Sequence, residues 1–167
     1  MYTARCTRKV LKALQVQPAD GHQMPTTALG DWYVNFIHMR RHRLVHFLSD
    51  RSLLSVLVPV KTLKTVLDRH VVELGELLYS MGLDASVVRA ELAAMNNRSV
   101  AKTNSSSILG SMRDLSLNAR WILEHTPTLS LTQVSLELSR VPCGPLGMAM
   151  PEEAAIELLL ERHSQQS

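Results

Sequence analysis

The chain has 167 residues, of which 46% are hydrophobic and 20% are charged, and this composition is typical of one globular domain. No stretch approaches the roughly 18 consecutive apolar residues that a membrane span needs, and the N-terminal segment lacks the apolar core of a signal peptide. We therefore expect a cytoplasmic protein, not a membrane protein, with a single domain over residues 1–167.

Charge is unevenly distributed along the chain. Residues 1–70 contain 11 Lys and Arg against 4 Asp and Glu, whereas residues 71–167 contain 7 against 11. A basic first half suits a polyanionic partner, because cationic side chains release counterions when they contact phosphates. The alternative is a basic surface that only keeps the protein in solution.

The first 59 residues are expected to be mainly strands with one short helix. Residues 2–6 suit a strand and residues 7–14 a helix, with Thr7 at its N-cap. Proline and glycine residues mark residues 17–30 as a loop.

From Asp31 the hydrophobic period changes to two, which is typical of strands. This alternation predicts a hairpin over residues 31–48 and a third strand over residues 53–58, ending at Pro59. Three consecutive antiparallel strands make a meander.

Beyond Pro59 the hydrophobic period becomes 3.6, so residues 60–167 are expected to be mainly helical. Capping residues and prolines divide this half into four to five helices. Their approximate ranges are 63–81, 84–95, 108–126, 131–139 and 151 onward. Residues 96–107 are polar and are expected to be irregular.

Strands followed by helices predict an α+β fold, in which an antiparallel β-meander in the N-terminal half is covered by the helices of the C-terminal half. A parallel sheet would need helical crossovers between the meander strands, and the sequence offers none there. We expect the helices to cover one face of the meander.

Three sequence blocks resemble a known family. They are Leu29–Phe36 (LGDWYVNF), Ser49–Pro59 (SDRSLLSVLVP) and Ala101–Met112 (AKTNSSSILGSM). Over most of its length the chain is similar to a family of small bacterial proteins catalogued as a domain of unknown function. The resemblance implies a bacterial, cytoplasmic, single-domain protein, and it transfers no activity, cofactor or site residue.

A candidate anion site precedes the helix that is expected to begin near Ile108. Free N–H groups and the positive end of the helix dipole attract anions at such a start, and nearby hydroxyl, amide and cationic side chains would add donors. The residues concerned are Arg98, Lys102, Thr103, Asn104, Ser105 and Ser106. Ordinary helix capping selects the same residue types, and the segment lacks the glycines and the Gly-Lys-Ser/Thr order of a P-loop.

The tip of the predicted hairpin is a second candidate site, for contact with nucleic acid. Arg40, Arg41 and Arg43 lie in or next to the turn, and a basic hairpin can follow a phosphate backbone or enter a groove. Aromatic residues of the preceding strand would supply stacking faces if they were exposed, although a place in the core suits them better. A merely solvated turn is the alternative.

No metal site or cofactor is predicted, and no catalytic residue is assigned. His38, His42 and His46 alternate along the hairpin without HxH or HExxH spacing. Cys6 and Cys143 lie far apart and outside any CxxC pair, so reduced thiols are expected rather than a disulfide bond.

The sequence supports three functional hypotheses, ranked in this order. The first is a non-enzymatic binding or regulatory module for a polyanion, with nucleic acid as the leading class. The second is an enzyme that acts on a nucleotide or an RNA phosphodiester, with residues 102–107 holding phosphate and His46 or His42 moving a proton. The third is a protein interaction domain, whose acidic helical half meets a partner or a second copy of the chain.

Overall fold

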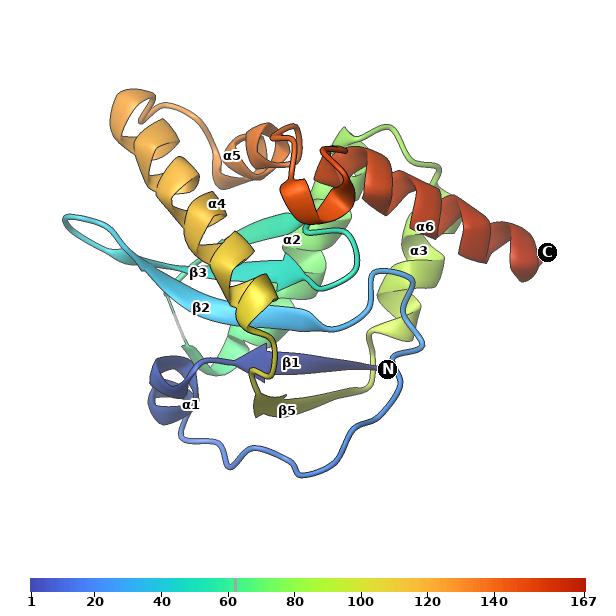
Figure 1. The fold of residues 1–167 in the computed structure, drawn as a ribbon, viewed down its shortest axis with the longest axis horizontal. Helices are drawn as coiled ribbons and strands as arrows, with labels where there is room; N and C mark the ends of the chain where they lie inside the picture. Colours follow the sequence, from blue (N-terminus) through green and yellow to red (C-terminus); the bar gives the residue numbers. More distant parts are fainter. Residues whose placement is uncertain (62) are drawn as a thin grey trace.

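In the computed structural model, which describes residues 1–61 and 63–167, a five-stranded sheet with strand order β4-β3-β2-β1-β5 forms the centre of the protein (Figure 1). The strands are β1 (Tyr2–Cys6), β2 (Trp32–His38), β3 (Arg43–Ser49), β4 (Ser55–Pro59) and β5 (Arg98–Lys102). Strands β2, β3 and β4 pair antiparallel, so the predicted meander is confirmed.

The sheet is mixed, however, and the prediction of a purely antiparallel sheet is wrong. Strand β1 pairs in parallel with β2 on one side and with β5 on the other, so that Ala4 lies opposite both Trp32 and Val100. A parallel pair needs a long crossover between its strands, and the helix and loop between Cys6 and Trp32 supply it. The segment that we expected to be irregular contributes β5.

The described part of the chain contains six α-helices. Five of them lie in the C-terminal half, at the upper end of the range expected there, and the sixth is the short helix expected after Thr7. They are α1 (Arg8–Leu14), α2 (Val66–Ser80), α3 (Ala85–Ala94), α4 (Ser106–His125), α5 (Leu131–Leu138) and α6 (Pro151–Gln165). Short 3-10 turns, η1 (Leu63–Thr65) and η2 (Gly144–Leu146), precede α2 and α6. None of the helices in this part is long and apolar enough to cross a membrane.

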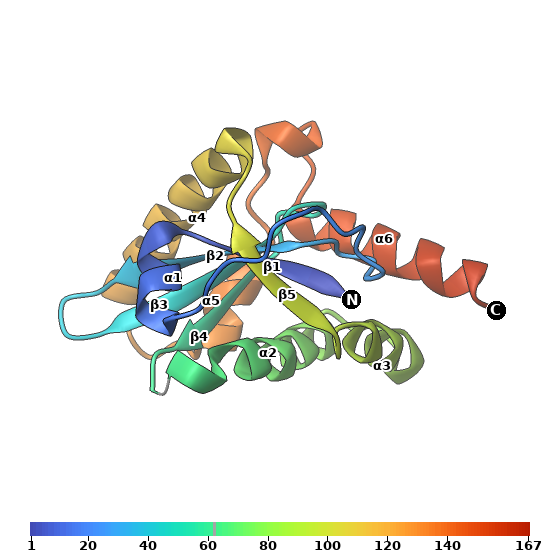
Figure 2. The same cartoon turned by 90° about the horizontal axis from the view of Figure 1, so that it is seen from below.

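Helices cover both faces of the sheet, so the expectation of one covered face is wrong. Residues from α2, α3 and α6 join the buried cluster on one face, and residues from α4 and α5 join the cluster on the other. Figure 2 shows α2 and α4 on opposite sides of the sheet. The physical reason lies in β2, where Trp32 and Val34 are buried on one face while Tyr33 and Ile37 are buried on the other.

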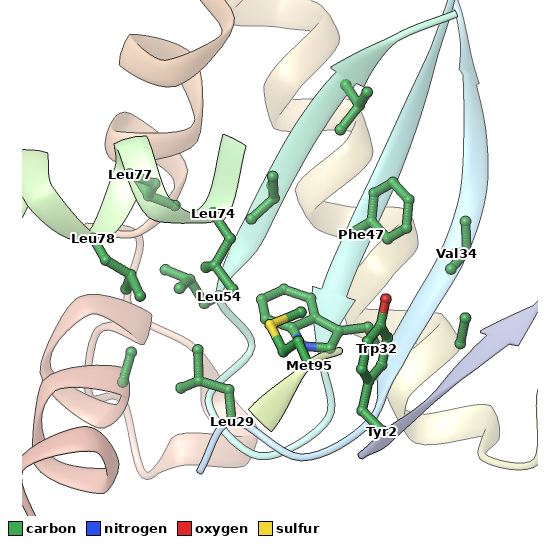
Figure 3. Packing of buried hydrophobic residues seen from close by; sticks show 14 of the residues in the cluster. Tyr2, Leu29, Trp32, Val34, Phe47, Leu54, Leu74, Leu77, Leu78 and Met95 are labelled. Carbon is green, nitrogen blue, oxygen red and sulfur yellow. The ribbon is translucent and has the colours of Figure 1, made fainter. Parts of the chain in front are cut away.

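The larger core lies between the sheet and α2, and it is built around aromatic side chains (Figure 3). The imidazole ring of His70 stacks on Phe47 with 4.0 Å between ring centroids, and it meets the edge of Trp32 at 4.5 Å. Within the described residues, both ring nitrogens of His70, the hydroxyl of Tyr2 and the indole nitrogen of Trp32 are buried without a hydrogen-bond partner. This part of the core therefore contains polar atoms whose desolvation is uncompensated.

Helix α5 protects the outer edge of the sheet. The backbone N–H of Leu57 in β4 donates a hydrogen bond of 3.2 Å to the hydroxyl of Ser135 in α5. Unpaired edge strands attract other strands, and a covering helix removes that hazard.

Candidate nucleic-acid interface

A groove of about 330 Å³ runs between the outer half of β2 and α4. It is lined by residues 35–38 of β2 and, from α4, by Leu109, Met112, Arg113, Ser116, Leu117 and Arg120. The groove exists because β1 ends opposite Val34, which leaves the rest of β2 without a neighbouring strand on that side. Its lining combines apolar and polar residues, and α4 contributes the guanidinium groups of Arg113 and Arg120.

The β2–β3 hairpin continues this surface beyond the sheet (Figure 1). Arg40 and Arg41 are exposed at the tip, and Met39 and Arg40 line a second hollow, of about 500 Å³, together with Glu124 of α4. Arg113 and Arg120 line the groove, Arg40 lines the hollow, and Arg41 follows Arg40 at the exposed tip. We call Arg40, Arg41, Arg113 and Arg120 the arginine cluster.

The arginine cluster is not neutralised by its surroundings. Among the described residues, none of its four members forms a salt bridge. Of the described residues that line the groove and the hollow, one is acidic, Glu124. A surface of this kind attracts anions over distances set by the ionic strength.

Arg43, the third arginine predicted at the hairpin tip, faces the other side of the sheet. Its guanidinium carbon lies 4.5 Å from the centroid of the Phe36 ring, in a cation–π contact. Strand alternation puts Phe36 in the core opposite to that of α4, so Arg43 lies behind the arginine cluster. The contact fixes its side chain while leaving the guanidinium exposed.

An exposed aromatic residue lies next to the arginine cluster. The side chain of Trp121 is 61% exposed, and one turn earlier Leu117 is 58% exposed. The indole of Trp121 stacks on the imidazole of His125 with 4.3 Å between ring centroids. Sequence reasoning missed Trp121, although its place off the apolar stripe of this helix is a signal that could have found it.

The aromatic residues of β2, by contrast, are core residues as expected. Trp32, Tyr33 and Phe36 are all buried, so none of them offers a free ring face to a base. The hydroxyl of Tyr33 donates a hydrogen bond to the side-chain carbonyl oxygen of Asn104.

The residues of the predicted anion loop do not all lie together in the structure. Lys102 ends β5, residues 103–105 connect the strand to α4, and Ser106 begins the helix. Arg98, by contrast, begins β5, roughly 13 Å from Lys102 at the usual rise of a strand. Arg98 pairs with Asp68 of α2 at 2.8 Å. The hydroxyl of Ser105 accepts a hydrogen bond of 3.2 Å from the N–H of Ile108, which is ordinary N-capping.

A polar network links β1 and β5 with the residue before β2 and the residue after β3. The Arg5 guanidinium lies 3.4 Å from the Asp31 carboxylate and also donates to the backbone carbonyl of Lys102 at 3.2 Å. Asp31 accepts from the backbone N–H of Thr3 at 2.9 Å, and its own N–H donates to the Asp50 carboxylate at 3.0 Å. Burial and the neighbouring Asp31 carboxylate raise the pKa of Asp50 to about 6. Because Arg5 and Asp31 are buried, we assign this network to the fold.

His46 is enclosed between the sheet and α4. Its Nδ1 is 2.9 Å from the hydroxyl of Ser116, and its Nε2 is 2.8 Å from the hydroxyl of Ser55. Burial lowers the pKa of His46 to about 3, so the ring is neutral at pH 7. A substrate cannot reach it, and the enzyme hypothesis loses this proton carrier. His42, the other one considered, is exposed at the hairpin tip.

The two cysteines, Cys6 and Cys143, are buried and unpaired. Burial raises the pKa of the Cys6 thiol to about 12, which keeps it protonated and unreactive. In the part of the chain that the structure describes, no group of three His, Cys, Asp or Glu side chains is arranged to hold a metal ion.

Comparison with known proteins gives a family and no activity. No curated protein matches the chain. One family model, described as "Domain of unknown function (DUF6933)", matches residues 3–154, a range that includes the sheet, the hairpin and α4. The chain therefore belongs to the DUF6933 family of domains of unknown function.

Proposed function

We propose that this protein is a non-enzymatic binding module for a polyanion, with nucleic acid as the leading class. The observation that carries the proposal is the arginine cluster, which places four unneutralised guanidinium groups on two adjoining elements. Guanidinium groups bind phosphate oxygens through paired hydrogen bonds, and each neutralised phosphate releases counterions.

The shape of the surface supports the same proposal. The hairpin projects beyond the sheet while α4 flanks it, so a strand of phosphates can contact the tip and the helix together (Figure 1). Arg43 extends the positive charge to the reverse side of the hairpin. The enclosed position of His46 favours binding over phosphodiester chemistry.

Replacement of the hairpin arginines tests the proposal. In Arg40→Ala/Arg41→Ala/Arg43→Ala we expect weaker binding of fluorescein-labelled oligonucleotides, measured by fluorescence anisotropy over a series of salt concentrations. The slope of log K against log salt should become shallower by about 2 to 3, since each lost phosphate contact contributes roughly 0.7 to 0.9.

A charge-matched control removes three basic residues from the other side of the sheet. Lys64, Arg69 and Arg89 lie on η1, α2 and α3, and none of them forms a salt bridge among the described residues. Their triple alanine variant has the same net charge as the hairpin variant and should keep most of the affinity. Equal losses in the two variants, or no binding by the unmodified protein even at low salt, would reject the proposal.

A further inference from the structure

We infer that the nucleic acid bound at this surface is single-stranded and that one of its bases stacks on Trp121. The inference rests on the proposed function and names the state of the ligand. It comes from the position of one exposed indole among arginines on α4.

The indole of Trp121 is ordered by its contact with His125, and its free side suits a flat ligand. One of its faces packs against the imidazole of His125, with an angle of 22° between the two planes. The Nδ1 of His125 lies 2.8 Å from the backbone carbonyl oxygen of Trp121, which anchors the imidazole one turn away. With 61% of its surface exposed, the indole keeps a face for a second ring. Such pre-ordering reduces the entropy lost on binding.

Charged and apolar residues alternate around this platform in a way that suits a nucleotide chain. Arg113, Leu117, Trp121 and His125 follow one another at intervals of four residues and so lie along one side of α4. Arg120 lies beside this stripe and lines the groove. An extended strand can place bases on the apolar members while its phosphates meet the guanidinium groups.

The exposed indole distinguishes a single strand from a duplex. In a duplex the faces of the bases are covered by their neighbours, whereas in a single strand they are free to stack on a protein ring. A duplex would use only the arginines. Charge favours nucleic acid over an apolar protein surface here, because such a partner would have to desolvate Arg113 and Arg120, and neither forms a salt bridge among the described residues.

The test compares two fluorescein-labelled probes, an oligothymidylate and a duplex of the same length, at one salt concentration. We expect the unmodified protein to bind the single strand more tightly and to lose tryptophan emission on titration with unlabelled oligothymidylate. In Trp121→Ala the affinity for the single strand should fall by about tenfold, while the affinity for the duplex changes by less than about twofold. Because Trp121 is exposed, this variant is expected to fold.

Two controls make the result specific. Trp121→Phe keeps an aromatic face and should retain most of the affinity for the single strand. Tyr79→Ala removes another exposed aromatic side chain, from α2 on the far side of the sheet, and should bind both probes as the unmodified protein does.

The outcomes separate this inference from the proposed function. Equal binding of both probes, with Trp121→Ala unchanged and the hairpin arginine variant weakened, would overturn the inference and leave the proposed function standing. No salt-dependent binding of either probe would overturn both. A dimer in native mass spectrometry that is lost in Trp121→Ala, without binding of oligothymidylate, would assign the stripe to self-association and also overturn the inference.

Discussion

Acid pH is expected to destabilise the protein through two buried histidines, His46 and His70. Neither ring is accessible to solvent, and burial lowers the pKa of each to about 3 from an ordinary value of 6.5. The charge of Arg98 lowers the pKa of His70 further. An unfolded chain binds protons at these rings below about pH 6.5, and the native protein does not, so the free energy of unfolding must fall as the pH drops from 6.5 towards 3.

The size of the effect follows from the two pKa values of each group. At pH 5 each histidine lowers the free energy of unfolding by about 2 kcal/mol, and the pair by about 4 kcal/mol, out of a total of roughly 5 to 15 kcal/mol for a domain. Asp50 acts in the opposite sense, because its raised pKa of about 6 lets the native protein bind a proton before the unfolded chain does. A comparison between two variants that both contain Asp50 removes this contribution.

His70→Leu is the variant to compare, since it removes one titrating ring from the core. In urea unfolding followed by circular dichroism at pH 7 and pH 5, the unmodified protein should lose about 2 kcal/mol more than His70→Leu. At pH 7 the variant should be at least as stable, because both ring nitrogens of His70 lack a partner among the described residues. Leu74→Val, a neighbouring core change without a titrating group, should lose as much as the unmodified protein. Equal losses in all three proteins would refute the reasoning.

Two further changes test how the loop before β2 is held. Glu91 is buried and accepts hydrogen bonds from two backbone N–H groups of this loop and from Arg162. Glu91→Ala should therefore lower the free energy of unfolding, measured in urea, by about 3 to 5 kcal/mol, and Glu91→Gln should lower it by less. At Gly30, where φ is +78°, an added Cβ would lie 2.2 Å from the Asp50 carboxylate. At Gly82 φ is similar, +84°, but no atom lies within 4 Å of an added Cβ. Gly30→Ala should therefore destabilise the protein more than Gly82→Ala. Similar urea midpoints for the two glycine variants would contradict the steric argument.

Local sequence patterns predicted the elements that depend on local contacts. The change of hydrophobic period at Pro59 separates the β2–β4 meander from α2 as expected. Helix α1 begins directly after Thr7, and Pro127 lies just beyond the end of α4. These features are set by nearest neighbours in the chain, which is why periodicity and capping suffice to find them.

The sheet order depended on contacts that no local pattern contains. Strand β5 is short and polar, with Arg98 and Lys102 at its ends, and short strands with charged side chains are typical of sheet edges, where they discourage pairing with other chains. Its partner β1 lies almost a hundred residues earlier, and their register is visible only in three dimensions. The burial of both faces of β2 was present in the sequence, since Tyr33 and Ile37 are as apolar as their neighbours, and it argued for helices on two sides.

The candidate site shows the same division between local and distant information. The arginines at the hairpin tip follow from the strand pattern, but Arg113 and Arg120 join them only because α4 packs across β2. Trp121 differs from these arginines, because its place on α4 follows from the helical spacing of the sequence alone. Its side chain lies on the polar side of α4 with 61% of its surface exposed, and this exposure is the observation on which the proposed contact with a base depends. Because the apolar stripe of a helix can be traced from residue spacing alone, the position of Trp121 off that stripe could have been predicted from the sequence, whereas its distance from the hairpin arginines could not.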